Sequence, residues 1–125
     1  MKTRILYIED NEQNLYLVRF MLEKQGYEVC EARDGQEGID SAAALLPDLI
    51  LLDIQLPQMD GYAVARALRQ NPDLTGTPIV AVTSYAMAGD REKAIEAGCN
   101  GYIEKPINPD TFMQQVEQHL PRREQ

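Results

Sequence analysis

Five short runs of apolar and β-branched residues recur along the chain, separated by longer stretches in which apolar residues return every three or four positions. The short runs cover residues 5–8, 27–30, 49–52, 79–82 and 101–103. Runs of this length and composition predict strands. The runs 5–8, 49–52 and 79–82 are almost continuously apolar, as expected of strands that flanking helices bury on both faces.

The stretches between these runs have the spacing of amphipathic helices. Leu15, Val18 and Leu22 fall on one helical face, and similar spacing recurs within 39–46, 63–68, 94–97 and 112–120. Residues that commonly begin or end helices agree with these limits. They are Asp34, Asp90 and Asn108 at or near the expected starts, and Gly26, Pro47, Asn71 and Gly98 at the expected ends.

Strand and helix therefore alternate five times, which predicts an α/β fold with a doubly wound, five-stranded parallel sheet and five flanking helices. Of the two common strand orders we expect the flavodoxin-like order 2-1-3-4-5 rather than a Rossmann arrangement. The length of 125 residues, with 44% hydrophobic and 26% charged residues, is typical of one folded domain. We place this domain at residues 1–121 and expect 122–125 to be a loose tail.

Composition limits the partners. Twelve basic and 20 acidic side chains give a net charge of −8, which repels nucleic acids and anionic membranes, so we expect neither as a partner. No apolar run is long enough to span a membrane, and Glu9 and Asp10 cut short the apolar start that a signal peptide would need. We therefore expect a cytoplasmic protein. Cys30 and Cys99 lack metal-site spacing and are predicted to be buried free thiols.

Charged and polar residues stand at the predicted carboxyl ends of four strands. Glu9 and Asp10 follow the first strand, Asp53 the third, Thr83 the fourth and Lys105 the fifth. Open α/β sheets bind ligands at this edge, near the point where the strand order reverses. No glycine-rich phosphate loop follows the first strand, so a nucleotide cofactor is not expected.

The three acids require a cation if they lie together. Like charges about 4 Å apart repel by about 1 to 4 kcal/mol per pair between bulk water and a protein surface. Mg²⁺ binds carboxylate oxygens, retains several waters and completes its shell with phosphate oxygens. Three carboxylates and Lys105 carry −2, which one Mg²⁺ would neutralise, so we predict magnesium as the cofactor.

A carboxylate can attack phosphorus and form an aspartyl phosphate. We expect Asp53, at the end of the central strand, to be the nucleophile, Glu9 and Asp10 to bind the metal, and Thr83 and Lys105 to contact phosphoryl oxygens. Each residue alone has an ordinary explanation, such as a turn at Asp53 or capping of the first helix by Glu9 and Asp10. Their joint occurrence at four strand ends favours one shared site.

These features resemble the receiver domain of bacterial two-component response regulators across essentially the whole chain, in a stand-alone, chemotaxis-regulator-like form. The resemblance rests on the pair Glu9-Asp10, on Asp53 followed by Leu56-Pro57 and Met59-Asp60-Gly61, on Thr83 and on Lys105-Pro106. It implies a phosphoacceptor signalling module that assists its own phosphorylation and autodephosphorylation and is not otherwise an enzyme.

The resemblance also implies partners and roles. Asp53 would accept a phosphoryl group from a histidine kinase or a histidine phosphotransfer protein, and the change would switch a surface that binds a downstream protein target. The implied metal ligands are Glu9, Asp10, Asp53 and the backbone carbonyl of Gln55. The resemblance implies that Thr83 and Lys105 contact the phosphoryl group and that Thr83 and Tyr102 are switch residues. It also implies a cis peptide bond between Lys105 and Pro106.

Some positions depart from the commonest pattern of that family. Glu9 is one methylene longer than the more frequent Asp, which could shift its metal contact. Gln55 and Tyr85 occupy variable positions beside the phosphorylation site, so the lifetime of the phosphate cannot be carried over. His119, the only histidine, is expected to interact with the carboxyl end of the last helix rather than to relay phosphate.

Alternative functions remain open on the sequence. The chain could be a phosphorelay receiver excised from a longer hybrid kinase or multidomain regulator, or a phosphorylation-independent scaffold. A phosphatase of the haloacid-dehalogenase type also uses a strand-end Asp as its acceptor, but it places an acid two residues later. Gln55 stands at that position here and cannot carry the proton.

Overall fold

The computed structural model describes residues 2–56, 58–84 and 89–120 and contains the predicted parallel sheet. The strands are hydrogen-bonded in the order β2-β1-β3-β4-β5, and every neighbouring pair is parallel. The flavodoxin-like order expected from the sequence is confirmed. The strands are β1 Arg4–Ile8, β2 Glu28–Ala32, β3 Leu49–Asp53, β4 Ile79–Thr83 and β5 Gly101–Glu104.

Five α-helices flank the sheet in the described part of the chain. They are α1 Glu12–Lys24, α2 Gly35–Leu45, α3 Gly61–Arg69, α4 Asp90–Glu96 and α5 Pro109–Glu117. A short 3-10 helix, η1 Pro72–Leu74, was not predicted. It begins where the side chain of Asn71 accepts a hydrogen bond from the backbone N–H of Asp73.

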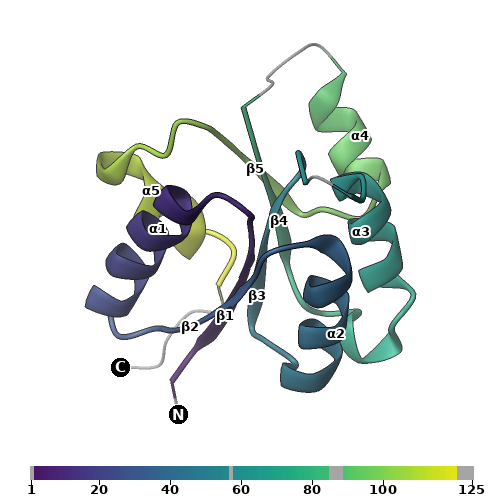
Figure 1. The fold of residues 1–125 in the computed structure, drawn as a ribbon, viewed down its shortest axis with the longest axis horizontal. Coiled ribbons are helices and arrows are strands. Elements are labelled where there is room, and N and C mark those ends of the chain that lie inside the picture. Colours follow the sequence, from purple (N-terminus) through teal and green to yellow (C-terminus); the bar gives the residue numbers. More distant parts are fainter. Residues whose placement is uncertain (1, 57, 85–88, 121–125) are drawn as a thin grey trace.

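The helices form two layers, with α1 and α5 on one face of the sheet and α2, α3 and α4 on the other (Figure 1). Alternate strand residues point to opposite layers because the side-chain period of a strand is two. On β1, Leu6 and Ile8 join the core beneath α2, α3 and α4, whereas Ile5 and Tyr7 join the core beneath α1 and α5. This burial on both faces explains the continuous apolar runs of β1, β3 and β4.

The second strand lies later than predicted. The apolar run suggested 27–30, but the backbone N–H of Tyr27 donates to the carbonyl of Leu22 and closes the end of α1. Beyond the predicted limit, Glu31 and Ala32 pair with Tyr7 and Ile8 of β1. The charged residue Glu31 concealed this extension, because β2 is an edge strand in which Glu31 is only half-buried.

Side chains cap most helix starts. Asp34 and Asn108 are N-caps as predicted, whereas the cap of α4 is Gly89 and Asp90 is the first helical residue. The cap of α1 is Asn11, whose side chain accepts from the backbone N–H of Asn14. The alternative in which Glu9 and Asp10 serve to cap this helix is therefore wrong.

The remaining structural expectations have mixed outcomes. Cys30 and Cys99 are free, but only Cys99 is buried, because Cys30 belongs to the edge strand and is half-buried. No helix in the described ranges has both the length and the apolar character needed to cross a bilayer. The predicted domain boundary at 121, the tail 122–125, and the motif residues Pro57 and Tyr85 lie outside the described residues.

Candidate functional site

The predicted site residues come together at the edge formed by the carboxyl ends of the strands, at the top of Figure 1. We call it the carboxyl edge. β3 lies between β1 and β4 in the sheet, so the residues after β1, at the end of β3 and at the end of β4 are neighbours. Residue Lys105 follows β5, and its backbone N–H donates to the carbonyl of Thr83 at 2.7 Å.

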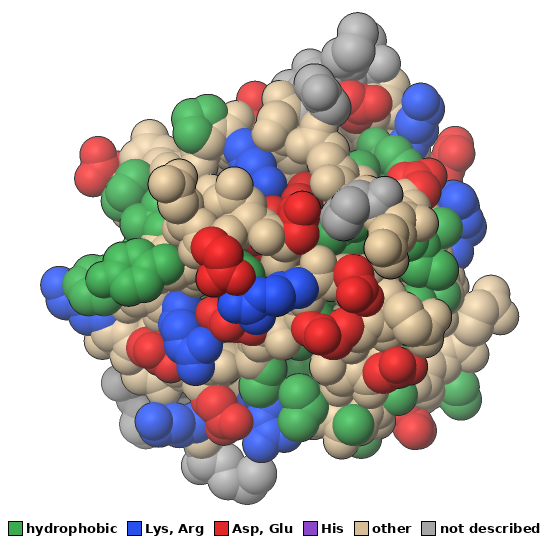
Figure 2. Space-filling view, viewed as in Figure 1, with side chains coloured by type: hydrophobic (Ala, Val, Ile, Leu, Met, Phe, Trp, Pro, Cys, Tyr) green, Lys and Arg blue, Asp and Glu red, His purple; other side chains and the backbone are tan. Residues whose placement is uncertain are grey.

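Three acids converge at this edge. Glu9, Asp10 and Asp53 each offer one carboxylate oxygen, and these oxygens all lie within 4.8 Å of one another. Glu9 and Asp53 are 0% and 2% exposed, whereas Asp10 faces solvent. Acidic and basic side chains are interspersed over the molecular face that Figure 2 shows.

Lys105 supplies positive charge to this cluster. Its Nζ lies 2.8 Å from Oε1 of Glu9 and 3.4 Å from Oδ2 of Asp53. The Lys105–Pro106 peptide bond is cis, as the resemblance implied. One lysine cannot balance three carboxylates, so the geometry leaves the site with an excess of negative charge.

The two buried carboxyl groups respond to this excess in opposite ways. Burial, together with the hydrogen bond and charge of Glu9, raises the pKa of Asp53 to about 7, although the N–H of Gln55 and the charge of Lys105 act against it. Burial also acts to raise the pKa of Glu9, but hydrogen bonds with Asp53, Lys105 and Tyr7 outweigh it and keep this pKa below the ordinary value. In the absence of a cation, Asp53 therefore binds a proton in preference to Glu9.

Backbone N–H groups fix the side chain of Asp53 and the backbone of the residue that follows it. The N–H of Gln55 donates to Oδ1 of Asp53 at 3.0 Å, and the N–H of Gly61 donates to the carbonyl of Ile54 at 3.1 Å. A β-carbon on Gly61 would collide with the backbone of Ile54 and with the carbonyl of Asp53, so only glycine permits this approach. Asp60, the N-cap of α3, accepts from the N–H of Tyr62. Asp60 and Gly61 of the family motif thus dock the start of α3 against the site.

The predicted contact and switch residues lie on β4 and β5. Thr83 is 2% exposed and pairs in register with Glu104, while Ala81 pairs with Tyr102. Tyr102 is half-buried against the core beneath α2, α3 and α4. Burial and the nearby charges of Asp90 and Glu104 raise the pKa of its phenol.

Sequence reasoning missed three contacts. The phenol of Tyr7 donates to Oε1 of Glu9 at 2.7 Å, and the side-chain amide of Asn14 donates to the same atom at 3.4 Å. The side-chain oxygen of Gln55 accepts from the N–H of Ser84 at 3.3 Å and so bridges β3 and β4. The period of a strand could have indicated the first, because residues 7 and 9 point to the same side.

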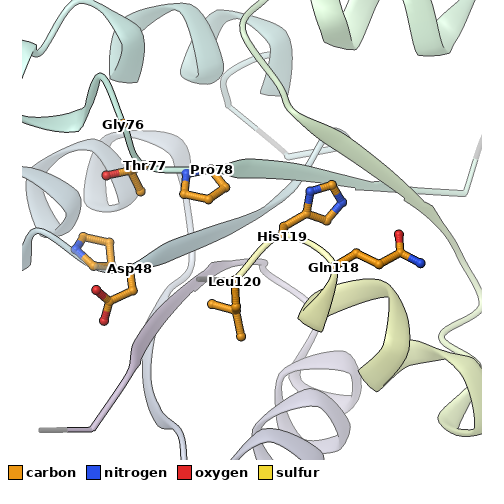
Figure 3. A pocket seen from close by; sticks show the side chains of 8 residues that line it. Asp48, Gly76, Thr77, Pro78, Gln118, His119 and Leu120 are labelled. Carbon is orange, nitrogen blue, oxygen red and sulfur yellow. The ribbon is translucent and has the colours of Figure 1, made fainter. Parts of the chain in front are cut away.

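A concave region lies at the opposite edge of the sheet, where the strands begin, and we call this the amino edge. It is a pocket of about 410 Å³ that side chains from the segments before β3 and β4 and from the end of α5 surround (Figure 3). Its lining includes Asp48, Thr77 and His119 but none of the predicted site residues. His119 follows α5, and its imidazole lies so close to Gly101 that a β-carbon there would collide with it. Packing against β5 therefore gives His119 a structural contact that the sequence did not reveal.

Comparison with known proteins defines the class that this fold and site represent. The response regulator receiver domain family matches residues 5–117, and the chain belongs to this family. Among curated relatives, the polar-differentiation response regulator DivK of Brucella anthropi is 41% identical over 120 residues, which are 96% of this chain and 98% of the relative.

Solved structures agree with this assignment. The chemotaxis protein CheY4 of Vibrio cholerae has a TM-score of 0.92 at 28% identity and covers 96% of this chain and 100% of that protein. The receiver domain of the sensor histidine kinase PA1611 of Pseudomonas aeruginosa has a TM-score of 0.86 at 34% identity, over 95% of this chain and 98% of that one. It holds a magnesium ion coordinated in its active-site cleft.

The chain is therefore a phosphoacceptor signalling domain of two-component systems rather than a conventional enzyme. Receiver domains bind Mg²⁺ at an acidic site and interact with histidine kinases and downstream targets. These findings do not favour the alternative of a phosphorylation-independent scaffold.

Proposed function

We propose that Asp53 is the phosphoacceptor and that a phosphohistidine on a partner protein is the donor. A carboxylate oxygen of Asp53 forms the new bond to phosphorus, and the histidine N–P bond breaks with its electron pair returning to the imidazole. The supporting observation is that Asp53, buried at the end of the central strand, lies with its Oδ2 3.4 Å from Nζ of Lys105. The ammonium group of Lys105 lies where a transferred phosphoryl group would bring negative charge.

The acids fit a magnesium ion. Glu9, Asp10 and Asp53 present oxygen ligands within 4.8 Å of one another, and hard oxygen donors are the ligands that Mg²⁺ prefers. We propose these three carboxylates, with the backbone carbonyl of Gln55, as the residues that hold it. When bound, the ion neutralises charge on the carboxylates and on the incoming phosphoryl oxygens.

Residues of the chain supply the other contacts to the phosphoryl group and carry the change to the surface. Lys105 forms an ion pair with a phosphoryl oxygen, and the hydroxyl of Thr83, adjacent at the end of β4, donates to another. Movement of Thr83 toward the phosphoryl group opens space toward β5, and the half-buried ring of Tyr102 fills it. The faces of α4, β5 and α5 then change shape for a downstream protein.

The donor must approach over the carboxyl edge, because β3 is buried along its length between two neighbouring strands. The helix α1 begins at Glu12, beside Asp10, and carries Tyr16 and Phe20 on its surface with 73% and 56% exposure. Their rings stack at a centroid distance of 6.5 Å. We propose that this apolar pair contributes to binding of the histidine kinase or histidine phosphotransfer protein. We propose that the protein acts in the cytoplasm together with such a partner.

Loss of the phosphoryl group is the second half of the cycle. We propose that the domain assists hydrolysis of its own aspartyl phosphate, because the same residues that neutralise charge during phosphorylation neutralise it again when water attacks. The side chain of Gln55 is held by the N–H of Ser84. We propose that Gln55, two residues after Asp53, flanks the attacking water.

One experiment tests the phosphoacceptor directly. The protein is incubated with acetyl phosphate and Mg²⁺, and its intact mass is measured. We expect one added phosphoryl group, which disappears with a chelator and in the variant Asp53→Asn. The matched control is Asp48→Asn, because Asp48 precedes the same strand but lies at the amino edge and accepts from the N–H of Arg4. Equal labelling of Asp53→Asn and wild type would refute the proposal.

A further inference from the structure

Strand β1, next to the central strand β3, carries a buried tyrosine close to the acidic cluster. Tyr7 is 1% exposed, and its ring packs with Ile5, Leu15 and Val18 in the core beneath α1 and α5. Its phenol donates to Oε1 of Glu9 at 2.7 Å, a short hydrogen bond to a charged group. A buried phenol needs such a partner, but a phenylalanine would fill the same space without one. The hydroxyl therefore has a purpose that packing alone does not explain.

The two oxygens of Glu9 are not equivalent. Oε1 receives Tyr7, Nζ of Lys105 at 2.8 Å and the amide of Asn14 at 3.4 Å. Oε2 accepts from the N–H of Asn11 at the longer distance of 3.3 Å, and Glu9 also shares a hydrogen bond with the carboxyl group of Asp53. A carboxylate oxygen has about two lone-pair directions, so Oε1 is saturated. The remaining acceptor capacity of Glu9 lies on Oε2.

We propose that Tyr7 is a positioning residue for the metal site: its hydroxyl fixes Oε1 of Glu9 and so leaves Oε2 for the cation. This inference rests on the proposed function, because it assigns a role within the same site. Tyr7 reaches Glu9 because residues two apart on a strand point to the same side of the sheet. It does not touch the cation and acts only through Glu9.

A glutamate needs this support more than an aspartate would. Its side chain has one more rotatable bond, and binding a cation requires that the bond be fixed. The hydrogen bond from Tyr7 fixes it in advance, within a strand whose backbone is held on both sides by β2 and β3. Outer partners of metal ligands generally change metal affinity by about 10 to 100-fold when removed.

The test compares two tyrosine variants, with Mn²⁺ as the probe and its electron paramagnetic resonance signal as the measure of free ion. Tyr7→Phe removes the hydroxyl and keeps the ring. The matched control is Tyr27→Phe: Tyr27 is 6% exposed in the same core, and its phenol donates to Oε2 of Glu117 at 3.1 Å, away from the acids. We expect Tyr7→Phe to weaken Mn²⁺ binding about 10-fold and Tyr27→Phe to leave it unchanged. Unchanged affinity in a folded Tyr7→Phe protein overturns the inference.

A second comparison establishes that Tyr7 acts through Glu9. In a Glu9→Asp background the carboxylate is one methylene shorter and withdraws from the phenol. We expect Tyr7→Phe to have no further effect on Mn²⁺ affinity in this background, so the two substitutions are coupled. The same loss of affinity in both backgrounds would show that Tyr7 acts by another route, and the inference would fail.

The outcomes separate this inference from the proposed function. If wild type binds Mn²⁺ and takes a phosphoryl group from acetyl phosphate, while Tyr7→Phe binds Mn²⁺ equally well, only the role of Tyr7 is refuted. If wild type neither binds Mn²⁺ nor takes a phosphoryl group, the proposed function itself is refuted. Circular dichroism and thermal unfolding of each variant establish that the protein compared is folded.

Discussion

Both edges of the sheet gather polar groups around a cationic side chain, but the two arrangements differ in charge. At the carboxyl edge Lys105 faces the carboxylates of Glu9 and Asp53. At the amino edge the guanidinium of Arg69 donates to neutral oxygens at 2.6 to 2.9 Å, which belong to Leu74, Thr77, Gly98 and Asn100. The carboxyl edge has an excess of negative charge, whereas the positive charge of Arg69 is stabilised by four hydrogen bonds to neutral oxygens.

This difference separates a reactive site from a structural one. Arg69 ties the end of α3 to η1 and to the loops that precede β4 and β5, and it leaves no negative charge to be neutralised. The acids at the carboxyl edge repel one another, and the raised pKa of Asp53 reflects that repulsion together with burial. Such a site gains stability by binding a cation, whereas the amino edge is already stable without one.

The largest expected effect comes from removing the positive charge of Lys105 at the carboxyl edge. Lys105→Met should slow phosphorylation of Asp53 by acetyl phosphate about 100 to 1,000-fold at saturating Mg²⁺, because charge on the transferring phosphoryl group loses its partner. The rate of mass increase measures this effect. Lys24→Met, at the end of α1, is the control and should react like wild type. A Lys105→Met protein that reacts at the wild-type rate would show that the lysine has only a structural role.

Removing the guanidinium of Arg69 at the amino edge should lower the stability of the fold and leave the rate of phosphorylation unchanged. Arg69→Met leaves several partly buried carbonyl oxygens without donors, and we expect a loss of about 3 kcal/mol in the free energy of unfolding. Urea unfolding followed by circular dichroism measures it. The folded variant should still take a phosphoryl group at the wild-type rate. A large drop in that rate would mean that the two edges are not independent.

The pH dependence of stability should reveal the repulsion among the acids. Folding raises the pKa of Asp53 from 3.8 to about 7, so the folded protein binds a proton there that the unfolded chain releases. Without metal, its contribution to the free energy of unfolding is complete below the unfolded pKa, near pH 4, and is lost as the pH rises through the folded pKa, near 7.

Two comparisons isolate this effect from the rest of the chain's charge. In chelator, Asp53→Asn should not show the loss between pH 4 and 7, so the difference between variant and wild type should widen with pH. Added Mg²⁺ at pH 8 should stabilise wild type far more than Asp53→Asn. Parallel pH profiles of the two proteins in chelator would contradict the assignment of the raised pKa to Asp53.

The smallest effect concerns the thiols. Cys99 adjoins the Arg69 network, and burial raises its pKa to about 11. At pH 8 iodoacetamide should therefore modify half-buried Cys30 at least about tenfold faster than Cys99, because the thiolate is the reactive form. Peptide mass mapping gives both rates. Arg69→Met should slow modification of Cys99 still further, because it removes a positive charge that acts to lower this pKa. Equal rates for the two thiols in wild type would disprove this protection.

The elements could be predicted from the sequence where local signals agree. Continuous apolar runs identify β1, β3 and β4, and the cap residues Asp34 and Asn108 locate the starts of α2 and α5. The signals fail where long-range contacts decide. The extent of β2 depends on pairing of Glu31 and Ala32 with β1. The cap of α1 is Asn11, although Glu9 and Asp10 could have served from their sequence positions alone.

For the site, the sequence determined which chemical groups stand at the strand ends, because strand polarity and the apolar pattern place Asp10, Asp53, Thr83 and Lys105 at one edge. Their catalytic and binding roles stay predictions. Tertiary structure alone decided how these groups are arranged: that Lys105 lies 2.8 Å from Glu9, that Glu9 and Asp53 are buried, and that Tyr7 occupies one oxygen of Glu9. The physical reason is that the charge balance and burial of a group depend on neighbours from distant segments, which only the packing of the sheet and its two helical layers brings within hydrogen-bonding distance.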